Sequence, residues 1–335
     1  IMIRNLRRDT NIYFVNRDVK TLLLDYSPEE FKFYTHVVQF IKRRYESIKK
    51  ECIPPDKKEG LSKEELKKIA DKYRQRGLLT FKLISLTRQI TSSIKTGIKA
   101  LKNYRETLED TKEQRYLDSL IEEGKRIDKD KKVEALKSLL KKEKKKVIIF
   151  TTFLNTQKII DEELMMMGFK TVLFNGKMNS REKENAIRRF KEDGQILITT
   201  DAGSEGRNLQ FAHILINFDL PWNPMRIEQR IGRVHRIGQT KDVRIINMSI
   251  NETVEAYILN RLYEKIDMFH TAIGEMDLII SQLSSKNSLE QDIFESFMED
   301  DVDKLGDALI RAKEGAESIK EFDSKIFDKN GSRTA

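Results

Sequence analysis

The first third of the chain has apolar residues at helical spacing. Ser27 and Glu30 have the spacing of a capping box, and after them apolar residues recur every three or four positions as far as Ile48. The same spacing over residues 78–101 predicts one further helix. Residues 27–130 are therefore predicted to form a helical unit.

The middle of the chain changes to short runs rich in Val, Ile and Phe, which are typical of buried strands. These runs cover residues 147–150, 171–174, 196–199, 214–218 and 243–248. Helical patterns begin between them at Asn155 and Asn179, and Asn179 with Glu182 has the spacing of a capping box. Strands alternating with helices indicate βαβ units and a mostly parallel sheet, so residues 131–250 are predicted to be one α/β domain.

The two ends of the chain are predicted to lie outside this α/β domain. Residues 12–15 and 19–24 are short apolar stretches, too few to build a sheet alone. Residues 1–26 are therefore interpreted as the trailing segment of another domain, and a chain that begins with Ile1 is interpreted as part of a longer protein. Residues 251–335 return to helical spacing and are expected to form C-terminal helices and a tail.

The charge of the chain indicates a class of binding partner. The formal net charge is +9, which favours polyanionic partners, nucleic acid first, although a lysine-rich soluble protein has the same composition. Residues 131–146 hold eight lysines and two glutamates, either a solvated helix face or a contact with the DNA backbone. The single cysteine, Cys52, excludes an intrachain disulfide framework, and the four histidines lack zinc-ligand spacing. The sequence indicates neither a membrane span nor a signal peptide, so the expected compartment is the cytoplasm.

Two polar loops follow predicted strands, where open α/β sheets bind ligands. Residues 200–208 contain two glycines, several hydroxyl or amide side chains and an arginine, which suit close approach to phosphate or ribose; a plain turn is the alternative. Residues 219–224 contain Trp222, the only tryptophan, which is either a core residue or a lever near nucleic acid.

Residues 229–239 contain three arginines spaced three apart. On a helix, the apolar residues of this segment form one stripe, while Arg233 and Arg236 point outward on another. Gly238 is expected to end the helix. Arginine suits phosphate because its guanidinium is planar and always charged. A structural salt-bridge cluster is the alternative, which the shortage of acidic residues nearby in the sequence disfavours.

A complete nucleotide site is missing from the sequence. The pattern Gly-x-x-x-x-Gly-Lys-Ser/Thr, whose backbone and lysine cradle phosphates, does not occur. Nor does a predicted strand end in paired acidic residues that would hold Mg²⁺.

These motifs together resemble the C-terminal RecA-like lobe of superfamily 2 helicases, in the SWI/SNF-type branch of double-stranded DNA translocases. The similarity lies in residues 147–249, and within them in residues 174–176, 198–209, 222–224 and 229–239. Residues 203–208 are similar to bacterial and archaeal members, including some that bind RNA polymerase. The implied fold is a RecA-like, P-loop-NTPase-type parallel sheet flanked by helices, with a helical N-terminal insertion and C-terminal helices.

The resemblance also implies roles for the matching residues. Arg233 and Arg236 would be catalytic arginine fingers that reach a nucleotide held by another lobe. The residues implied near the nucleotide are Gly206, Asn208, Gln229 and Arg230, and those implied near nucleic acid are Thr200, Thr152 and Trp222. Asn208 stands where helicase relatives often have an acidic residue for ribose, which departs from the family pattern.

The implied function is that of the second motor lobe of an ATP-dependent double-stranded DNA translocase. ATP and Mg²⁺ would be held mainly by the first RecA-like lobe, in cis, so this chain alone is expected to lack ATPase activity. Double-stranded DNA and either RNA polymerase or another DNA-processing protein are the expected partners, with no membrane, in a cytoplasmic, nucleoid-associated location. The alternatives are a docking module without motor activity and a lobe of an RNA helicase.

Overall fold

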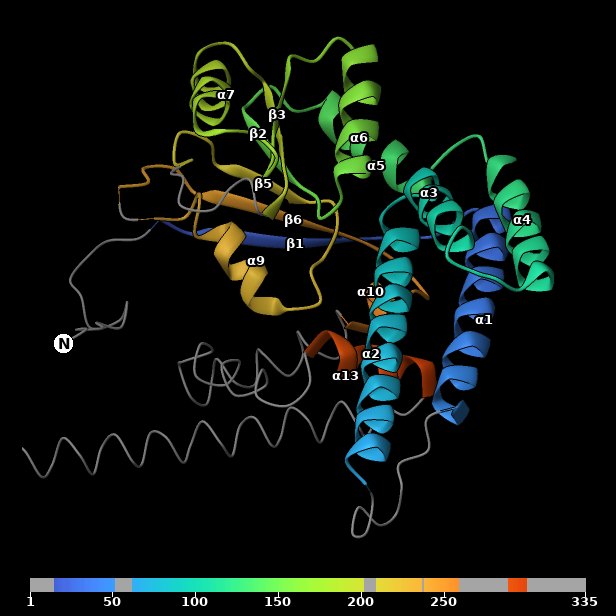
Figure 1. Cartoon of the computed structure of the whole chain (residues 1–335). Helices are drawn as coiled ribbons and strands as arrows, with labels where there is room; N and C mark the ends of the chain where they lie inside the picture. Colours follow the sequence, from blue (N-terminus) through green and yellow to red (C-terminus); the bar gives the residue numbers. More distant parts are fainter. Residues whose placement is uncertain (1–14, 52–61, 202–208, 237, 259–288, 300–335) are drawn as a thin grey trace, which may run out of the picture. The chain divides into compact units, whose positions relative to one another are not determined.

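The computed structural model describes residues 15–51, 62–201, 209–236, 238–258 and 289–299 (Figure 1). The chain divides into two compact units. One unit combines residues 1–34 with residues 89–255, and the other combines residues 35–88 with residues 256–335. Each unit therefore joins segments that are far apart in the sequence, whereas the domains expected from composition are contiguous.

The first unit is built around a six-stranded sheet in which every described pairing is parallel. The strands are β1 (Arg17–Leu24), β2 (Val147–Phe150), β3 (Thr171–Phe174), β4 (Ile196–Thr199), β5 (Ile214–Asn217) and β6 (Val243–Ile250). Their order across the sheet is β1-β6-β5-β2-β4-β3. The predicted parallel α/β sheet is confirmed. The five strands β2 to β6 all begin at the residue that the apolar runs predicted, and β6 ends two residues later than predicted.

Strand β1 corrects one interpretation of the sequence. It is the edge strand of this sheet and pairs with β6 along its whole length, from Arg17 opposite Val243 to Leu24 opposite Ile250. Residues 17–24 therefore complete this domain and are not a remnant of another one. Local spacing gave no sign of this because the two paired strands are separated by most of the chain.

After the first two helices of the chain, seven helices among the described residues lie wholly or partly in this unit (Figure 1). They are α3 (Ile94–Arg105), α4 (Thr111–Lys125), α5 (Lys131–Lys141), α6 (Leu154–Met166), α7 (Ser180–Glu192), α9 (Pro224–Ile231) and α10 (Val254–Ile258). Helices α1 (Pro28–Glu51) and α2 (Lys63–Ser92) each contribute residues to both units.

Both predicted capping boxes are confirmed, whereas one predicted helix is not. At the start of α1, the Ser27 and Glu30 side chains exchange hydrogen bonds with each other's backbone amides. Asn179 and Glu182 form the same reciprocal pair at α7. The prediction of one helix over residues 78–101 is wrong, because Ser93 is extended and caps α3 by accepting a hydrogen bond from the amide of Thr96. A serine that can bond the backbone two or three residues ahead competes with helix continuation.

The core lies on both faces of the sheet, because side chains alternate along each strand. On one face, Val147 and Ile149 belong to a buried cluster with apolar residues of α5 and α6. On the other face, the guanidinium carbon of Arg230, in α9, lies 5.2 Å from the centre of the Phe150 ring. Helices α5 and α9 thus pack on opposite faces of the same sheet.

The described part of the second unit is helical. Its described residues come from α1, α2, α10 and α13 (Leu289–Glu299). Tyr45 packs edge-to-face on Phe294 at 5.5 Å between ring centres, and Lys49 forms an ion pair with Glu299 at 2.5 Å. Helix α13 therefore packs on α1, although the two are far apart in the sequence. Among the helices that the structure describes, none has an apolar stretch long enough to cross a membrane.

Candidate functional site

The candidate site lies at the carboxyl ends of β5, β2 and β4, which are neighbours in the sheet. Because the strands are parallel, the residues that follow them meet at one edge. Thr151 and Thr152 follow β2, Thr200 and Asp201 follow β4, and Asp219 follows β5 closely. The first polar loop expected from the sequence, residues 200–208, begins here, although residues 202–208 lie outside the described residues.

Arg230 is the centre of a buried polar cluster at this edge. Its side chain is only 2 % exposed. The Nε and Nη2 atoms donate to the two carboxylate oxygens of Asp201 at 2.6 and 3.0 Å. The Nη1 atom donates to Oδ1 of Asn217 at 3.1 Å and to the carbonyl of Asp219 at 2.7 Å. One guanidinium thus ties α9 to the ends of β4 and β5.

These contacts support the salt-bridge interpretation for Arg230, which the sequence disfavoured. The acidic partner was judged to be missing because it is distant in sequence: Asp201 precedes Arg230 by 29 residues. Four of the five N–H groups of the guanidinium donate to protein atoms, which leaves one N–H group for a ligand. The geometry of Arg230 is that of a residue that holds α9 in position, and its contact with a nucleotide stays a prediction.

Arg233 and Arg236 do not continue the helix, which corrects the helical phase assumed for them. Helix α9 ends at Ile231, and residues 232–236 form turns and bends. The amides of Val234 and His235 donate to the carbonyl of Ile231 at 3.0 and 2.8 Å, which closes the chain into a tight turn. Gly238 follows with a φ of +93°, a left-handed conformation that favours glycine.

The two arginines nevertheless remain directed away from the core. Arg233 is half-buried and Arg236 is exposed. Within the described part of the chain, neither guanidinium has an ion pair or a hydrogen bond with a side chain. We refer to residues 232–239 as the arginine turn.

Gln239 fixes the arginine turn to the segment that follows the first polar loop. Its amide nitrogen lies within hydrogen-bonding distance of the carbonyls of Gln210, Ala212 and Val234, at 2.9, 3.2 and 3.1 Å. The amide of Leu209 also donates to the carbonyl of Arg233 at 3.1 Å. The arginine turn and the end of the polar loop are therefore held together by backbone and amide contacts.

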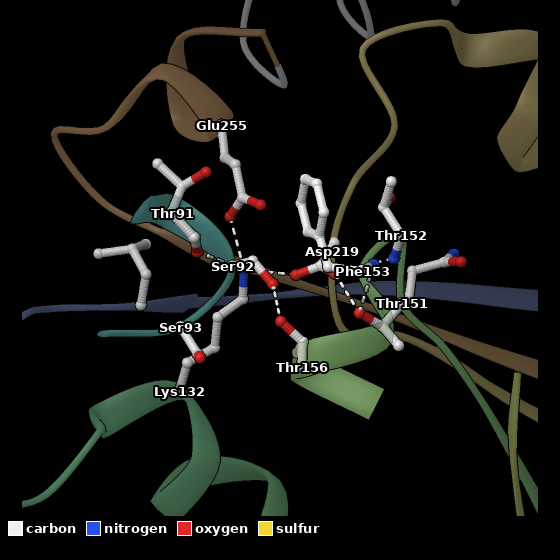
Figure 2. Close-up of polar contacts among 12 residues, drawn as sticks. Thr91, Ser92, Ser93, Lys132, Thr151, Thr152, Phe153, Thr156, Asp219 and Glu255 are labelled. Carbon is white, nitrogen blue, oxygen red and sulfur yellow. Dashed lines mark hydrogen bonds and ion pairs between the residues drawn. The ribbon is translucent and has the colours of Figure 1, made fainter. Parts of the chain in front are cut away.

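Asp219 joins the ends of β5 and β2 (Figure 2). Its Oδ2 atom accepts hydrogen bonds from the hydroxyl of Thr151 and, at 3.0 Å, from the amide of Thr152. Its Oδ1 atom is buried without a hydrogen bond among the described residues, as is the hydroxyl of Thr152. Asp219 is 3 % exposed, so this carboxylate belongs to the interior of the site.

A second amide clamp holds the ends of β3 and β4. Gln157, in α6, is buried, and its Nε2 donates to the carbonyls of Phe174 and Ile198 at 3.1 and 2.8 Å. Asn175 in turn donates to Oε1 of Gln157 at 2.9 Å. Asn175 belongs to residues 174–176, which carried part of the resemblance, and its visible contact is structural.

The remaining predicted site residues differ in how far their side chains are exposed to solvent. Trp222 is 1 % exposed, so it is a core residue, and its interpretation as a lever near nucleic acid is not supported in this conformation. Thr200 is 5 % exposed and Thr152 is half-buried, while Gln229 is exposed on α9. Gly206 and Asn208 lie outside the described residues. Contacts of these residues with nucleotide or nucleic acid stay predictions.

Sequence reasoning did not single out the acidic and amide residues of the site. Asp201 and Asp219 were included only as loop positions, and Asn217 and Gln239 were given no structural role. A usable signal was present for the two aspartates, because each stands two residues after a buried strand, on the edge where open α/β sheets bind ligands. Lys132 was expected either on a solvated helix face or in contact with the DNA backbone, yet it is 1 % exposed.

The comparisons with known proteins agree with this geometry. Residues 131–238 match the family described as helicase conserved C-terminal domain. This chain carries a helicase C-terminal lobe. The resemblance to the C-terminal RecA-like lobe of SWI/SNF-type helicases is confirmed.

The chain has relatives in bacteria and plants. It is 34 % identical over 290 residues to the uncharacterized ATP-dependent helicase YqhH of Bacillus subtilis, covering 86 % of this chain and 47 % of that protein. It is 37 % identical over 133 residues to the RNA polymerase-associated protein RapA of Proteus mirabilis, covering 36 % of this chain and 14 % of that one. It is 32 % identical over 167 residues to the ATP-dependent DNA helicase DDM1 of Arabidopsis thaliana, covering 48 % and 22 %. The chain thus spans less than half the length of these relatives.

Solved structures share the fold of the helicase lobe. The C-terminal part of the Fun30 ATPase domain aligns over 87 % of this chain and 100 % of its own, with a TM-score of 0.54 and 19 % identity. The Pyrococcus furiosus Hef helicase domain aligns over 74 % of this chain and 58 % of its own, also with a TM-score of 0.54 and 19 % identity.

Proposed function

We propose that this chain is the second motor lobe of an ATP-dependent double-stranded DNA translocase, in which Arg233 and Arg236 act on the phosphates of a nucleotide held by a first lobe. The observation that carries the proposal is the arginine turn. It presents two guanidinium groups without protein partners among the described residues, on a backbone that Gln239 holds to the segment preceding β5.

A buried cation is normally paired, as Arg230 is with Asp201. Arg233 and Arg236 follow that paired arginine in the sequence, are more exposed, and have no side-chain partner among the described residues. Guanidinium groups held on a fixed backbone stabilise charge on a transferring phosphoryl group without reorganisation when the reaction occurs. Bound ATP would supply the phosphoryl group that is transferred to water, and the residues of this lobe would orient and stabilise it.

The roles within the site would then differ between the three arginines. Arg230 would position α9 against the ends of β4 and β5, as its four hydrogen bonds support. Arg233 and Arg236 would contact the phosphates directly. Gly206, Asn208 and Gln229 would lie near the nucleotide, and Mg²⁺ would be held by the first lobe.

The nucleic-acid side of the proposal rests on charge and on the family. The chain has a formal net charge of +9, and DDM1 is a DNA helicase by name. Thr152 and Thr200 would contact the DNA backbone from the ends of β2 and β4. Such a lobe would work in the cytoplasm, near the nucleoid. RNA polymerase is the protein partner proposed from the likeness to RapA.

The test uses the protein in which this lobe is joined to its first lobe. Arg233→Ala and Arg236→Ala are expected to lower the DNA-stimulated ATPase rate by about 10³–10⁵-fold, the range that arginine fingers contribute. Arg226→Ala is the matched control, because Arg226 is an exposed arginine of helix α9, which directly precedes the arginine turn, and its rate is expected to be unchanged. Wild-type turnover in both finger variants would overturn the proposal.

Two further measurements separate this function from the alternatives. The 335-residue chain alone is expected to hydrolyse ATP at the rate of a buffer blank, and robust hydrolysis would contradict the two-lobe site. Stimulation of the joined protein by duplex DNA but not by RNA is expected, whereas the reverse preference would indicate an RNA helicase. A docking module without motor activity would show no ATPase in either case.

A further inference from the structure

Lys132, at the beginning of α5, is a buried cation outside the arginine cluster. Its Nζ donates to Oε2 of Glu255 at 2.6 Å and to the carbonyl of Thr91 at 3.2 Å (Figure 2). It also lies 4.0 Å from Oδ1 of Asp219 and 5.3 Å from the centre of the Phe218 ring. Lysine is almost never fully buried unless it is paired, so these contacts explain how the position accepts a charge. A buried ion pair is weak evidence for stability, and its value lies more in fixing a geometry.

Asp219 connects Lys132 to the arginine cluster through the sheet. Lys132 approaches the carboxylate from α5, which packs on one face of the sheet. Arg230 approaches the main-chain carbonyl of the same residue from α9, on the opposite face. A displacement of Asp219 would therefore act on both cations, and the path from Lys132 to Arg230 runs through a single residue.

Glu255 occupies the other end of this path, five residues beyond the end of β6. It is 2 % exposed, and it is the last residue of the first compact unit. Burial raises the pKa of Glu255 to about 7, Lys132 lowers it and Asp219 raises it. The Glu255 carboxylate in turn helps to raise the pKa of the phenols of Tyr26 and Tyr34, for which burial is the larger cause, so both phenols are neutral near pH 7. Near neutral pH, Glu255 therefore changes between a carboxylate that pairs with Lys132 and a neutral acid.

We propose that Lys132 is a positioning residue that couples Glu255, where the chain leaves the sheet-containing unit, to Asp219 and through it to Arg230 and the arginine turn. This inference rests on the proposed function for its effect on ATP hydrolysis, but the coupling itself is a property of this chain. Ionised Glu255 holds Lys132 between two carboxylates, which fixes Asp219. Neutral Glu255 leaves Lys132 facing Asp219 alone, and the residues after β5 shift.

Trp222 makes the coupling measurable in the 335-residue chain itself. It is the only tryptophan, it is 1 % exposed, and it follows Asp219 by three residues. Its fluorescence emission, recorded from pH 5 to pH 9, is expected to change with a midpoint near 7. In Glu255→Gln this step is expected to disappear, because the amide does not ionise. Glu252→Gln is the matched control, because Glu252 is an exposed glutamate in the same segment and its loss leaves the step in place.

The effect on the motor is tested in the protein joined to its first lobe. Lys132→Met is expected to lower kcat by on the order of 10²-fold with KM for ATP nearly unchanged, the pattern of a residue that affects the transition state through geometry. Lys141→Met, an exposed lysine of the same helix, is expected to leave kcat unchanged. In the wild-type protein kcat is expected to rise between pH 6 and pH 8, as Glu255 ionises. Glu255→Gln is expected to remove this rise.

The outcomes separate this inference from the proposed function. A Trp222 emission step that persists in Glu255→Gln would overturn the coupling, whatever the ATPase measurements show. Wild-type kcat in Lys132→Met, with a strong defect in Arg233→Ala, would overturn the coupling and leave the function of the arginines intact. Wild-type turnover in Arg233→Ala, with the emission step lost in Glu255→Gln, would overturn the proposed function and leave the coupling. If Lys132→Met fails to fold, Glu255→Gln is used for both the Trp222 emission measurement and the kcat measurement.

Discussion

Replacement of Arg230 by methionine tests whether this arginine is structural. Methionine fills a similar volume and removes all four hydrogen bonds of the guanidinium. It leaves the Asp201 carboxylate without its cation, and it leaves the Asn217 amide oxygen and the Asp219 carbonyl without a donor. Breaking a fully buried ion pair costs about 3–5 kcal/mol, and because the Asp201 side chain is 22 % exposed the expected cost here is about 2–4 kcal/mol. With a urea dependence of about 2–3 kcal/mol per molar, the unfolding midpoint should fall by roughly 1–2 M.

The assay is urea unfolding of the 335-residue chain, followed by the emission of Trp222, which is buried in the same compact unit as Arg230. Arg226→Met is the control, because Arg226 is exposed on the same helix, and its cost is expected to stay within about 0.5 kcal/mol. If the two variants unfold at the same urea concentration, the contacts of Arg230 do not stabilise the lobe. The assignment of Arg230 as the residue that positions α9 would then be refuted.

Two further predictions concern packing and pH. Gly97→Ala is expected to cost about 1–3 kcal/mol in the same urea assay, because the added Cβ would meet Cδ1 of Ile90 and lie 3.0 Å from the Ile90 backbone Cα; an unchanged midpoint would show that α2 and α3 separate easily. The free energy of unfolding is expected to fall by roughly 3 kcal/mol as pH rises from about 4.5 to about 7, because folded Glu255, with its pKa of about 7, holds its proton more tightly than the unfolded chain does. Urea midpoints at pH 5 and pH 8 measure this loss, and Glu255→Gln should have a smaller difference between them than wild type.

The features that the sequence predicted are those that depend on neighbouring residues. Strand β2 is a run of four buried apolar residues, and the cap of α7 needs only Asn179 and Glu182, which are three residues apart. The ligand-binding edge followed from the rule that parallel strands end together. For these elements, local pattern and final contacts agree because the same short segment makes both.

The features that the sequence did not predict depend on partners that are distant in the chain. β1 pairs with a strand more than two hundred residues later, and Arg230 finds its acidic partner 29 residues earlier. Lys132 reads as one of eight lysines in residues 131–146, and only its approach to Glu255, 123 residues away, makes it a buried cation. The arginine turn was misjudged for a different reason. Helical spacing continued past Ile231, but backbone bonds to the segment around Leu209 end the helix there.

The most direct test of the arginine turn is the rate of a single turnover of ATP hydrolysis. It is measured in the protein that joins this lobe to its first lobe, with saturating ATP and duplex DNA, for wild type and for Arg233→Ala. If Arg233 stabilises the transferring phosphoryl group, the rate should fall by about 10³–10⁵-fold while ATP binding is retained. A single-turnover rate equal to that of wild type would contradict the assignment of this arginine to catalysis.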